Sequence, residues 1–248
     1  MNTDSFIVLT AAVNPRKEVP FVALTPEVRL SLYKPALKNW LSVAEQIGSK
    51  LVVVETTGEP LSSLFDVLDQ DKVLFYSFTP PSELHKLGKG ALESACMDYV
   101  VNQLEVLVNA DATIHKATGK LIIPNAEKIL ITQNPNSITI RRSMDRSTSD
   151  TRVFSTTLKT WQQNFTSMSS ETDDADPQRY LEHVLGNRII MGEYSKQLRV
   201  QRFREIPKIE GVSGSDGTRY GGFSKDGLSN FLSYIEAKFL PHFTRRKI

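Results

Sequence analysis

The sequence has one cysteine, four histidines and almost no net charge. Cys96 alone can form neither an internal disulfide nor a cysteine-based zinc site, and the histidines show no metal-ligand spacing. A net charge of +2 gives no indication of nucleic-acid binding through bulk electrostatics. The first apolar run has no basic segment before it and is too short for a signal peptide or a membrane span. We therefore expect a cytoplasmic protein in which any phosphate is recognised locally.

Apolar strands and amphipathic helices alternate along the first half of the chain. Residues 6–13, 50–55, 72–78 and 111–116 are short runs bounded by turn-forming residues, which is typical of buried strands. Helical periodicity lies between them, and the first helix starts at Thr25 with a proline in its first turn. This order predicts a single α/β domain with a mainly parallel central sheet and helices on both faces.

The second half carries a less regular pattern. The sequence predicts strands at 128–132, 137–142 and 152–156, helices near 158–165 and 177–190, and an exposed acidic loop at 167–176 whose carboxylates are solvated. Residues 211–222 are rich in glycine, which predicts an irregular segment that is either a linker or a mobile lid. A final helix at 228–248 ends in basic residues, a pattern compatible with packing on the core or with peripheral contact to an anionic membrane.

A glycine-containing loop opens the helix that follows the third strand. Gly88 and Gly90 leave room for a phosphate near the backbone, and Lys89 between them supplies a positive charge. The free N–H groups of the following helix point to the same place. We therefore expect Gly88, Lys89 and Gly90 to bind an anionic ligand.

Polar and basic residues gather at the ends of the predicted strands. In open α/β sheets the ligand crevice lies at the carboxyl ends of the strands. By position, Thr10, Asn14 and Glu55 would meet a nucleotide there. The residues predicted to contact a ligand at the end of the fourth strand are Lys116, Thr118, Gly119 and Lys120.

The order of these segments resembles that of the GT-A-type glycosyltransferases, in particular small bacterial enzymes that build surface polysaccharides. The segments are VLTAAVNP, a helix that carries Arg29, VVVETTG, GKGALE and IHKATGKL, and the resemblance spans about residues 6–190. It implies a nucleotide-sugar donor, a saccharide or lipid-linked saccharide acceptor, and no nucleic-acid partner. It also divides the chain into a donor half (6–116), an acceptor and catalytic half (117–210) and a final segment (211–248).

Such enzymes normally carry an Asp-x-Asp motif after this strand, which holds a divalent metal on the diphosphate. This chain has lysines there instead, and lysines can meet the leaving diphosphate directly. We therefore expect that no metal is required, with a divalent ion such as Mn²⁺ or Mg²⁺ as the alternative. Asp150 would hold a sugar hydroxyl or that metal, and Arg152 a phosphate; an ion pair at the surface is the alternative for both.

Glu182 lies where the resemblance places the catalytic carboxylate of inverting enzymes. A carboxylate there can accept the proton of the acceptor hydroxyl. His183 beside it would contact the acceptor or be structural. Two other functions stay open: nucleotidyl transfer to a sugar phosphate, which normally needs a glycine-rich loop after the first strand, and a non-catalytic module that binds saccharides or anions.

Overall fold

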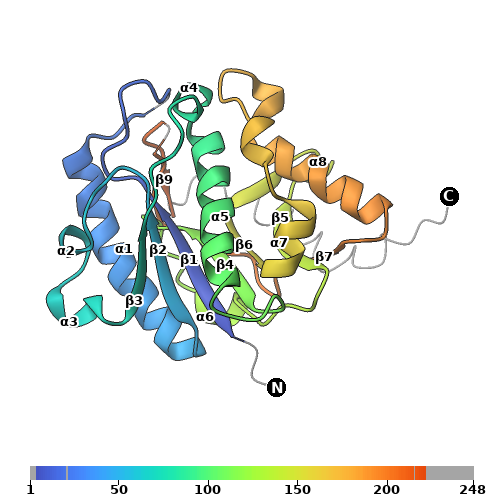
Figure 1. Ribbon diagram of the computed structural model, residues 1–248, viewed down its shortest axis with the longest axis horizontal. Helices are drawn as coiled ribbons and strands as arrows, with labels where there is room; N and C mark the ends of the chain where they lie inside the picture. Colours follow the sequence, from blue (N-terminus) through green and yellow to red (C-terminus); the bar gives the residue numbers. More distant parts are fainter. Residues whose placement is uncertain (1–3, 21, 215, 222–248) are drawn as a thin grey trace.

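A seven-stranded sheet forms the centre of the protein (Figure 1). The computed structural model describes residues 4–20, 22–214 and 216–221. The strand order is β3-β2-β1-β4-β6-β5-β7, and only β6 runs antiparallel to its neighbours. The strands are β1 (Ser5–Ala11), β2 (Lys50–Glu55), β3 (Val73–Ser77), β4 (Thr113–Thr118), β5 (Ser137–Arg142), β6 (Ser149–Thr157) and β7 (Arg199–Gln201).

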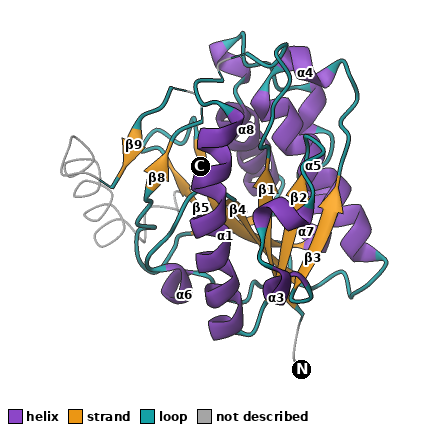
Figure 2. Ribbon diagram, turned by 90° about the vertical axis from the view of Figure 1, so that its left-hand side faces the viewer, coloured by secondary structure: helices purple, strands orange, loops and turns teal. Residues whose placement is uncertain are grey.

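Helices cover both faces of this sheet, as Figures 1 and 2 show. One face packs on α1 (Pro26–Ile47) and α6 (Ala126–Ile129), and the other packs on α5 (Lys89–Glu105), α7 (Leu158–Asn164) and α8 (Leu181–Tyr194). Successive side chains of a strand point to opposite faces, so β1 places Ile7 in the first core and Val8 in the second. The predicted mainly parallel α/β sheet with helices on both faces is confirmed.

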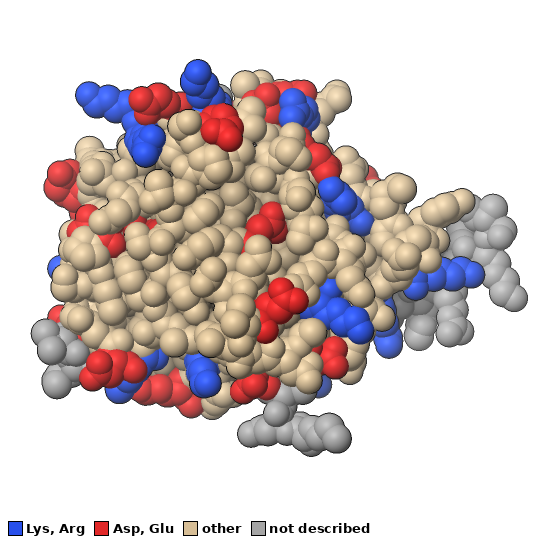
Figure 3. All heavy atoms as spheres, viewed as in Figure 1, with Lys and Arg blue, Asp and Glu red and all other residues tan. Residues whose placement is uncertain are grey.

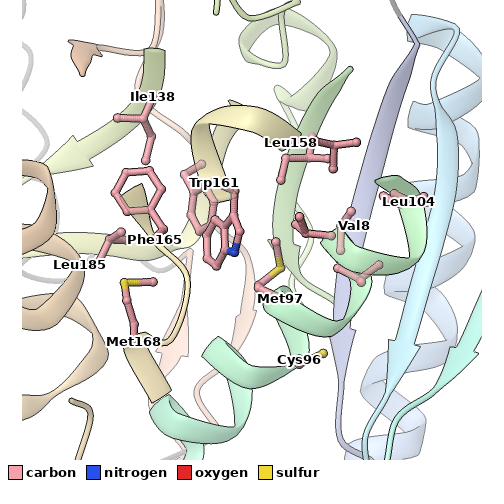
Figure 4. Close-up of a cluster of buried hydrophobic side chains, with 14 of the residues drawn as sticks. Val8, Cys96, Met97, Leu104, Ile138, Leu158, Trp161, Phe165, Met168 and Leu185 are labelled. Carbon is pink, nitrogen blue, oxygen red and sulfur yellow. The ribbon is translucent and has the colours of Figure 1, made fainter. Parts of the chain in front are cut away.

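The two cores are each centred on a buried tryptophan. Trp40 of α1 donates its indole N–H to the carbonyl of Leu121 at 2.7 Å, and Trp161 of α7 donates to Asp98 of α5 at 2.8 Å. Figure 4 shows Trp161 beside Phe165 and Met97. Cys96 is buried in the same cluster.

Helix α1 begins and ends at sequence signals. The Thr25 hydroxyl accepts from the N–H of Val28 at 3.4 Å, and Pro26 occupies the first position. The helix ends at Gly48, which has a left-handed backbone with φ of 67°. Pro35 lies inside without ending the helix.

The prediction of one strand was wrong. Residues 128–132, predicted as a strand, instead contain the end of α6 and an irregular stretch. Between β2 and β3 lie two short helices, α2 (Leu61–Leu64) and α3 (Val67–Gln70). A further short helix, α4 (Leu84–Leu87), precedes α5, and two 3₁₀ turns lie at Met168–Ser170 and Pro177–Arg179.

The glycine-rich segment is also more ordered than predicted. It forms a two-stranded hairpin of β8 (Gly211–Val212) and β9 (Arg219–Tyr220), attached to the main body by a bridge between Ile122 and Glu210. Gly211 has φ of 130°, a conformation that side chains rarely adopt. The predicted final helix and its membrane contact lie outside the described residues.

The surface agrees with a nearly neutral chain. On the face drawn in Figure 3, basic and acidic side chains are interspersed and lie mostly around the rim. Among the described residues, none of the helices is long and apolar enough to cross a membrane.

Candidate active site

A large cleft of about 1270 Å³ opens at the carboxyl ends of β1, β2 and β4. It is bounded by the start of α1, the starts of α5 and α8, and the β8–β9 hairpin. This is the edge at which the sequence placed a ligand site. Ten of the predicted site residues line it: Thr10, Asn14, Arg29, Lys89, Gly90, Thr118, Lys120, Asp150, Arg152 and Glu182.

Arg29 enters this cleft from the first turns of α1. Its Nε donates to the carbonyl of Ala12 at 2.6 Å, while the hydroxyl of Tyr33, one turn later, accepts from the N–H of Ala12 at 3.0 Å. Burial raises the pKa of Tyr33, against the influence of Arg29. These bonds fix the loop after β1. Arg29 is only 5% exposed, and its buried Nη1 has no hydrogen-bond partner among the described residues.

Lys120 is the second buried cation of the cleft, with 7% exposure. Burial, together with the positive charges of Arg29 and Lys89, lowers its pKa to about 7. Within the described part of the chain, neither Arg29 nor Lys120 forms an ion pair. Two neighbouring buried cations without a counter-ion favour the binding of an anion between them.

Gly119 contributes to this arrangement without lining the cleft, which corrects its prediction as a ligand contact. Its N–H donates to the carbonyl of Thr10 at 3.1 Å, and a Cβ at this position would lie 3.0 Å from that oxygen. The glycine therefore lets the chain after β4 pass closely over β1, and this path leads directly to Lys120.

The predicted phosphate loop at the start of α5 was wrong in its main point. The carboxylate of Asp174 accepts from the N–H of Lys89 at 2.8 Å and more weakly from that of Gly90 at 3.4 Å. A Cβ on Gly88 would overlap this carboxylate, and one on Gly90 would lie 2.8 Å from Thr172. The glycines are therefore needed for close packing, and Gly88 does not line the cleft.

Asp174 also corrects the prediction that the acidic loop is simply solvated. Its own N–H donates to the carbonyl of Leu87 at 2.7 Å, so the loop is tied to the α4–α5 junction at two points. Burial raises the pKa of this carboxyl, against its bonds to Lys89 and Gly90. The Lys89 side chain still lies in the cleft, where burial lowers its pKa and the charges of Asp174 and Glu182 oppose that effect.

Lys116 does not reach the cleft, contrary to the prediction that it meets a diphosphate. β4 extends to Thr118, so Lys116 lies inside the strand, 1% exposed. Its ammonium forms an ion pair with Glu93 of α5 and donates to the carbonyl of Thr151 at 2.5 Å. It is a structural cation that joins α5 to β6.

Glu182 occupies the first turn of α8 and faces the cleft. Its Oε1 accepts from the hydroxyl of Thr151 at 3.0 Å, and Thr151 is the residue whose carbonyl Lys116 holds. Burial raises the pKa of Glu182, and the charges of Glu93 and Asp150 raise it further. A fixed carboxylate with a raised pKa is suited to accept a proton.

His183 follows Glu182 but is not among the residues that line the cleft. Its side chain therefore gives no support to the predicted acceptor contact. The helical step from Glu182 turns it by about 100°, so neighbouring residues of α8 cannot share one face.

Asp150 and Arg152 line the cleft as a bonded pair. The guanidinium donates from Nε to Oδ1 at 2.8 Å and from Nη2 to Oδ2 at 2.7 Å, and it lies 4.9 Å from the ring centre of Tyr220. The charge of Arg152 is thus compensated, while the ring of Tyr220 ties the hairpin to β6.

Glu55 does not meet a nucleotide as predicted, because it is fully buried and binds the protein backbone. Its carboxylate accepts from the N–H groups of Val13, Thr57 and Glu59 at 3.0, 2.6 and 3.0 Å, and from the Thr57 hydroxyl at 2.6 Å. It has no acceptor capacity left for a nucleotide. Its role is to hold together the loops after β1 and β2.

Sequence reasoning missed several residues that shape the cleft. These residues are Tyr33, His85, Thr151, Asp174, Gly214 and Tyr220. Tyr33 carried a signal, since it lies four residues after Arg29 on one helix face. The contacts of Asp174 and Gly214 join segments far apart in the chain, and no local pattern marks them.

The residues in the place of the expected acid pair do not suit a metal ion. That place holds Lys116 and Thr118, and the adjacent cleft contains the cations Arg29 and Lys120. Across the described residues, no three His, Cys, Asp or Glu side chains gather in a way that could hold a metal ion. Oxygen-rich anionic ligand sets are what Mn²⁺ and Mg²⁺ require.

Comparison of the sequence with models of protein families and with curated proteins finds no match. Among solved structures, the galactosyltransferase LgtC, in complex with donor and acceptor sugar analogues, is similar over 73% of this chain and 70% of its own, with 11% identity and a TM-score of 0.48. A 4-diphosphocytidyl-2C-methyl-D-erythritol synthase is similar over 94% of this chain and 99% of its own, with 12% identity and a TM-score of 0.42. Both scores are below 0.5, so the function proposed below rests on the site.

Proposed function

We propose that this protein is a glycosyltransferase that moves a sugar from a nucleotide-sugar donor to a saccharide or lipid-linked saccharide acceptor, with inversion. The observation that carries the proposal is the pair of buried cations without counter-ions, Arg29 and Lys120, in a cleft that also contains the desolvated carboxylate of Glu182. A diphosphate supplies the missing negative charge, and the carboxylate supplies a base.

The reaction follows from these two features. The acceptor oxygen attacks the anomeric carbon while its proton passes to Glu182. The bond from that carbon to the diphosphate oxygen breaks, and its electron pair leaves on the nucleoside diphosphate. Arg29, Lys89 and Lys120 stabilise the charge that develops there. Attack opposite to the leaving group inverts the configuration of the sugar.

The remaining polar residues position these groups. Lys116 and Thr151 hold Glu182 in place through one chain of hydrogen bonds. Thr10 and Asn14 line the cleft at the end of β1, where the nucleoside would lie. Because cations take the place of an acid pair, we propose leaving-group stabilisation by side chains, without a required metal.

Incubation with a panel of nucleotide sugars tests this function. Slow release of nucleoside diphosphate, and faster release when saccharide acceptors are added, is the expected result. Release of pyrophosphate from a nucleoside triphosphate and a sugar phosphate would show nucleotidyl transfer instead. Binding without release of any product would identify a binding module. The resemblance to surface-polysaccharide enzymes makes bacterial surface saccharides the first acceptors to try.

A further inference from the structure

Like Arg29, Arg142 and Ser149, His85 lines the cleft and has a buried polar atom without a hydrogen-bond partner among the described residues. It belongs to the short helix α4 and is 6% exposed. Neither of its ring nitrogens has a hydrogen-bond partner among the described residues, although the side chain lines the cleft. A buried donor and acceptor left unsatisfied is costly, so its retention in a cleft indicates a ligand that pairs with it.

The loops after β1, β2 and β3 give the cleft a partly apolar lining, to which His85 of α4 also belongs. Val19, Val22 and Pro80 give the cleft apolar lining from the loops after β1 and β3, and Thr57 and Gly58 add backbone from the loop after β2. These loops lie together because β1, β2 and β3 are adjacent parallel strands. The buried cations Arg29 and Lys120 belong to other parts of the cleft lining, at the start of α1 and after β4.

The imidazole ring is neutral near physiological pH. Burial lowers the pKa of His85, and the charge of Arg16 lowers it further. The charge of Glu18 and the nearby carbonyl of Pro80 oppose these effects, although this carbonyl is not positioned to form a hydrogen bond with the ring. A neutral imidazole offers one donor and one acceptor. Phosphate oxygens need donors only, whereas the edge of a nucleobase presents donors and acceptors together.

We propose that His85 is the residue that reads the nucleobase of the donor. This inference rests on the proposed function, because it assumes a nucleotide in the cleft. A site built to hydrogen-bond one polar edge rejects ligands that leave its own groups unpaired. His85 therefore sets which nucleoside diphosphate is accepted, while the cations set the affinity for the diphosphate itself.

Titration calorimetry with UDP, CDP, GDP, ADP and inorganic pyrophosphate tests this assignment. His85→Leu should weaken the binding of the preferred nucleoside diphosphate by about 10-fold for each hydrogen bond lost, and it should leave the affinity for pyrophosphate unchanged. Its melting temperature should equal or exceed that of the wild type, because an unsatisfied buried polar group is removed. His85→Gln, which keeps a donor and an acceptor, should retain part of the preference and serves if the leucine variant fails to fold.

His183→Leu is the matched control, since that histidine does not line the cleft. Unchanged base preference in His85→Leu and His85→Gln overturns the proposal, as does an equal loss for pyrophosphate. A loss for nucleotide sugars alone, with nucleoside diphosphates bound normally, would assign His85 to the donor sugar and also overturn it. If the wild-type protein binds neither pyrophosphate nor any nucleoside diphosphate, the proposed function itself fails.

Discussion

Gly214 of the hairpin gives the sharpest test of the cation pair. It lies against the ends of Lys120 and Arg29: a Cβ built on it would overlap the Lys120 ammonium and lie 3.2 Å from Arg29 Nη1. Its φ is not in the left-handed range, so alanine costs little in backbone strain. The ammonium ends a flexible side chain, and it can move aside. Gly214→Ala should therefore displace a functional cation while the protein stays folded.

The size of the effect follows from the bond that is lost. A charge-assisted hydrogen bond to an anion contributes about 1.5–3 kcal/mol. Displacing Lys120 from a bound diphosphate should then weaken binding by about 10- to 150-fold. Titration calorimetry with pyrophosphate measures this directly, and the melting temperature reports whether the fold is kept.

Gly217→Ala is the control in the same hairpin. Gly217 has φ of 73° and no atom within 4 Å of an added Cβ, so alanine there strains the hairpin without touching the cations. It should lower stability slightly and leave pyrophosphate affinity near the wild-type value. Normal binding by Gly214→Ala, or an equal loss in Gly217→Ala, would refute the assignment of Lys120 and Arg29 to the diphosphate.

Three further substitutions test the base, the buried lysine and the titrating one. Glu182→Gln should keep nucleoside-diphosphate affinity and cut transfer by about 10²–10⁴-fold; normal transfer in a rate assay would remove Glu182 from the mechanism. Lys116→Met should lower the melting temperature, because Glu93 loses its partner at a cost of up to about 3–5 kcal/mol in stability. The double variant Lys116→Met with Glu93→Gln should recover part of this stability. An unchanged melting temperature in the single variant would show that the ion pair contributes nothing. Sulfate has a constant charge near neutrality, and its binding should weaken as the pH rises through about 7, because Lys120 then loses the proton that attracts the anion. The Lys120→Arg variant should bind sulfate equally below and above this pH, because arginine stays charged. Wild-type binding that does not change with pH would contradict the role of Lys120.

The parallel sheet was predictable because its signals are local. Each early strand is an apolar run, and α1 carries its cap, its proline and its terminal glycine in the sequence. Strand β4 was harder. Two of its interior residues are polar, and the predicted strand, 111–116, lies two residues before the observed one.

Those polar residues are buried because distant partners satisfy them. His115 contacts the Ser155 hydroxyl at 2.7 Å, and burial lowers the pKa of its ring to about 3, so it is neutral; Lys116 is paired with Glu93. Ser155 is 40 residues away along the chain. Strand pairing creates the first environment and the packing of α5 on the sheet creates the second, so the sequence pattern alone assigned Lys116 to the ligand edge.

The pairing of each basic residue separates those that build the protein from those that could bind a ligand. Lys116 and Arg152 looked alike in the sequence as phosphate contacts, and both have a carboxylate partner in the structure. Arg29 and Lys120 are buried too, yet no described carboxylate pairs with them. A buried charge without a partner is costly to the folded protein. Folding alone gives no reason to keep two such charges side by side at the rim of one cleft, whereas an anionic ligand that neutralises both does.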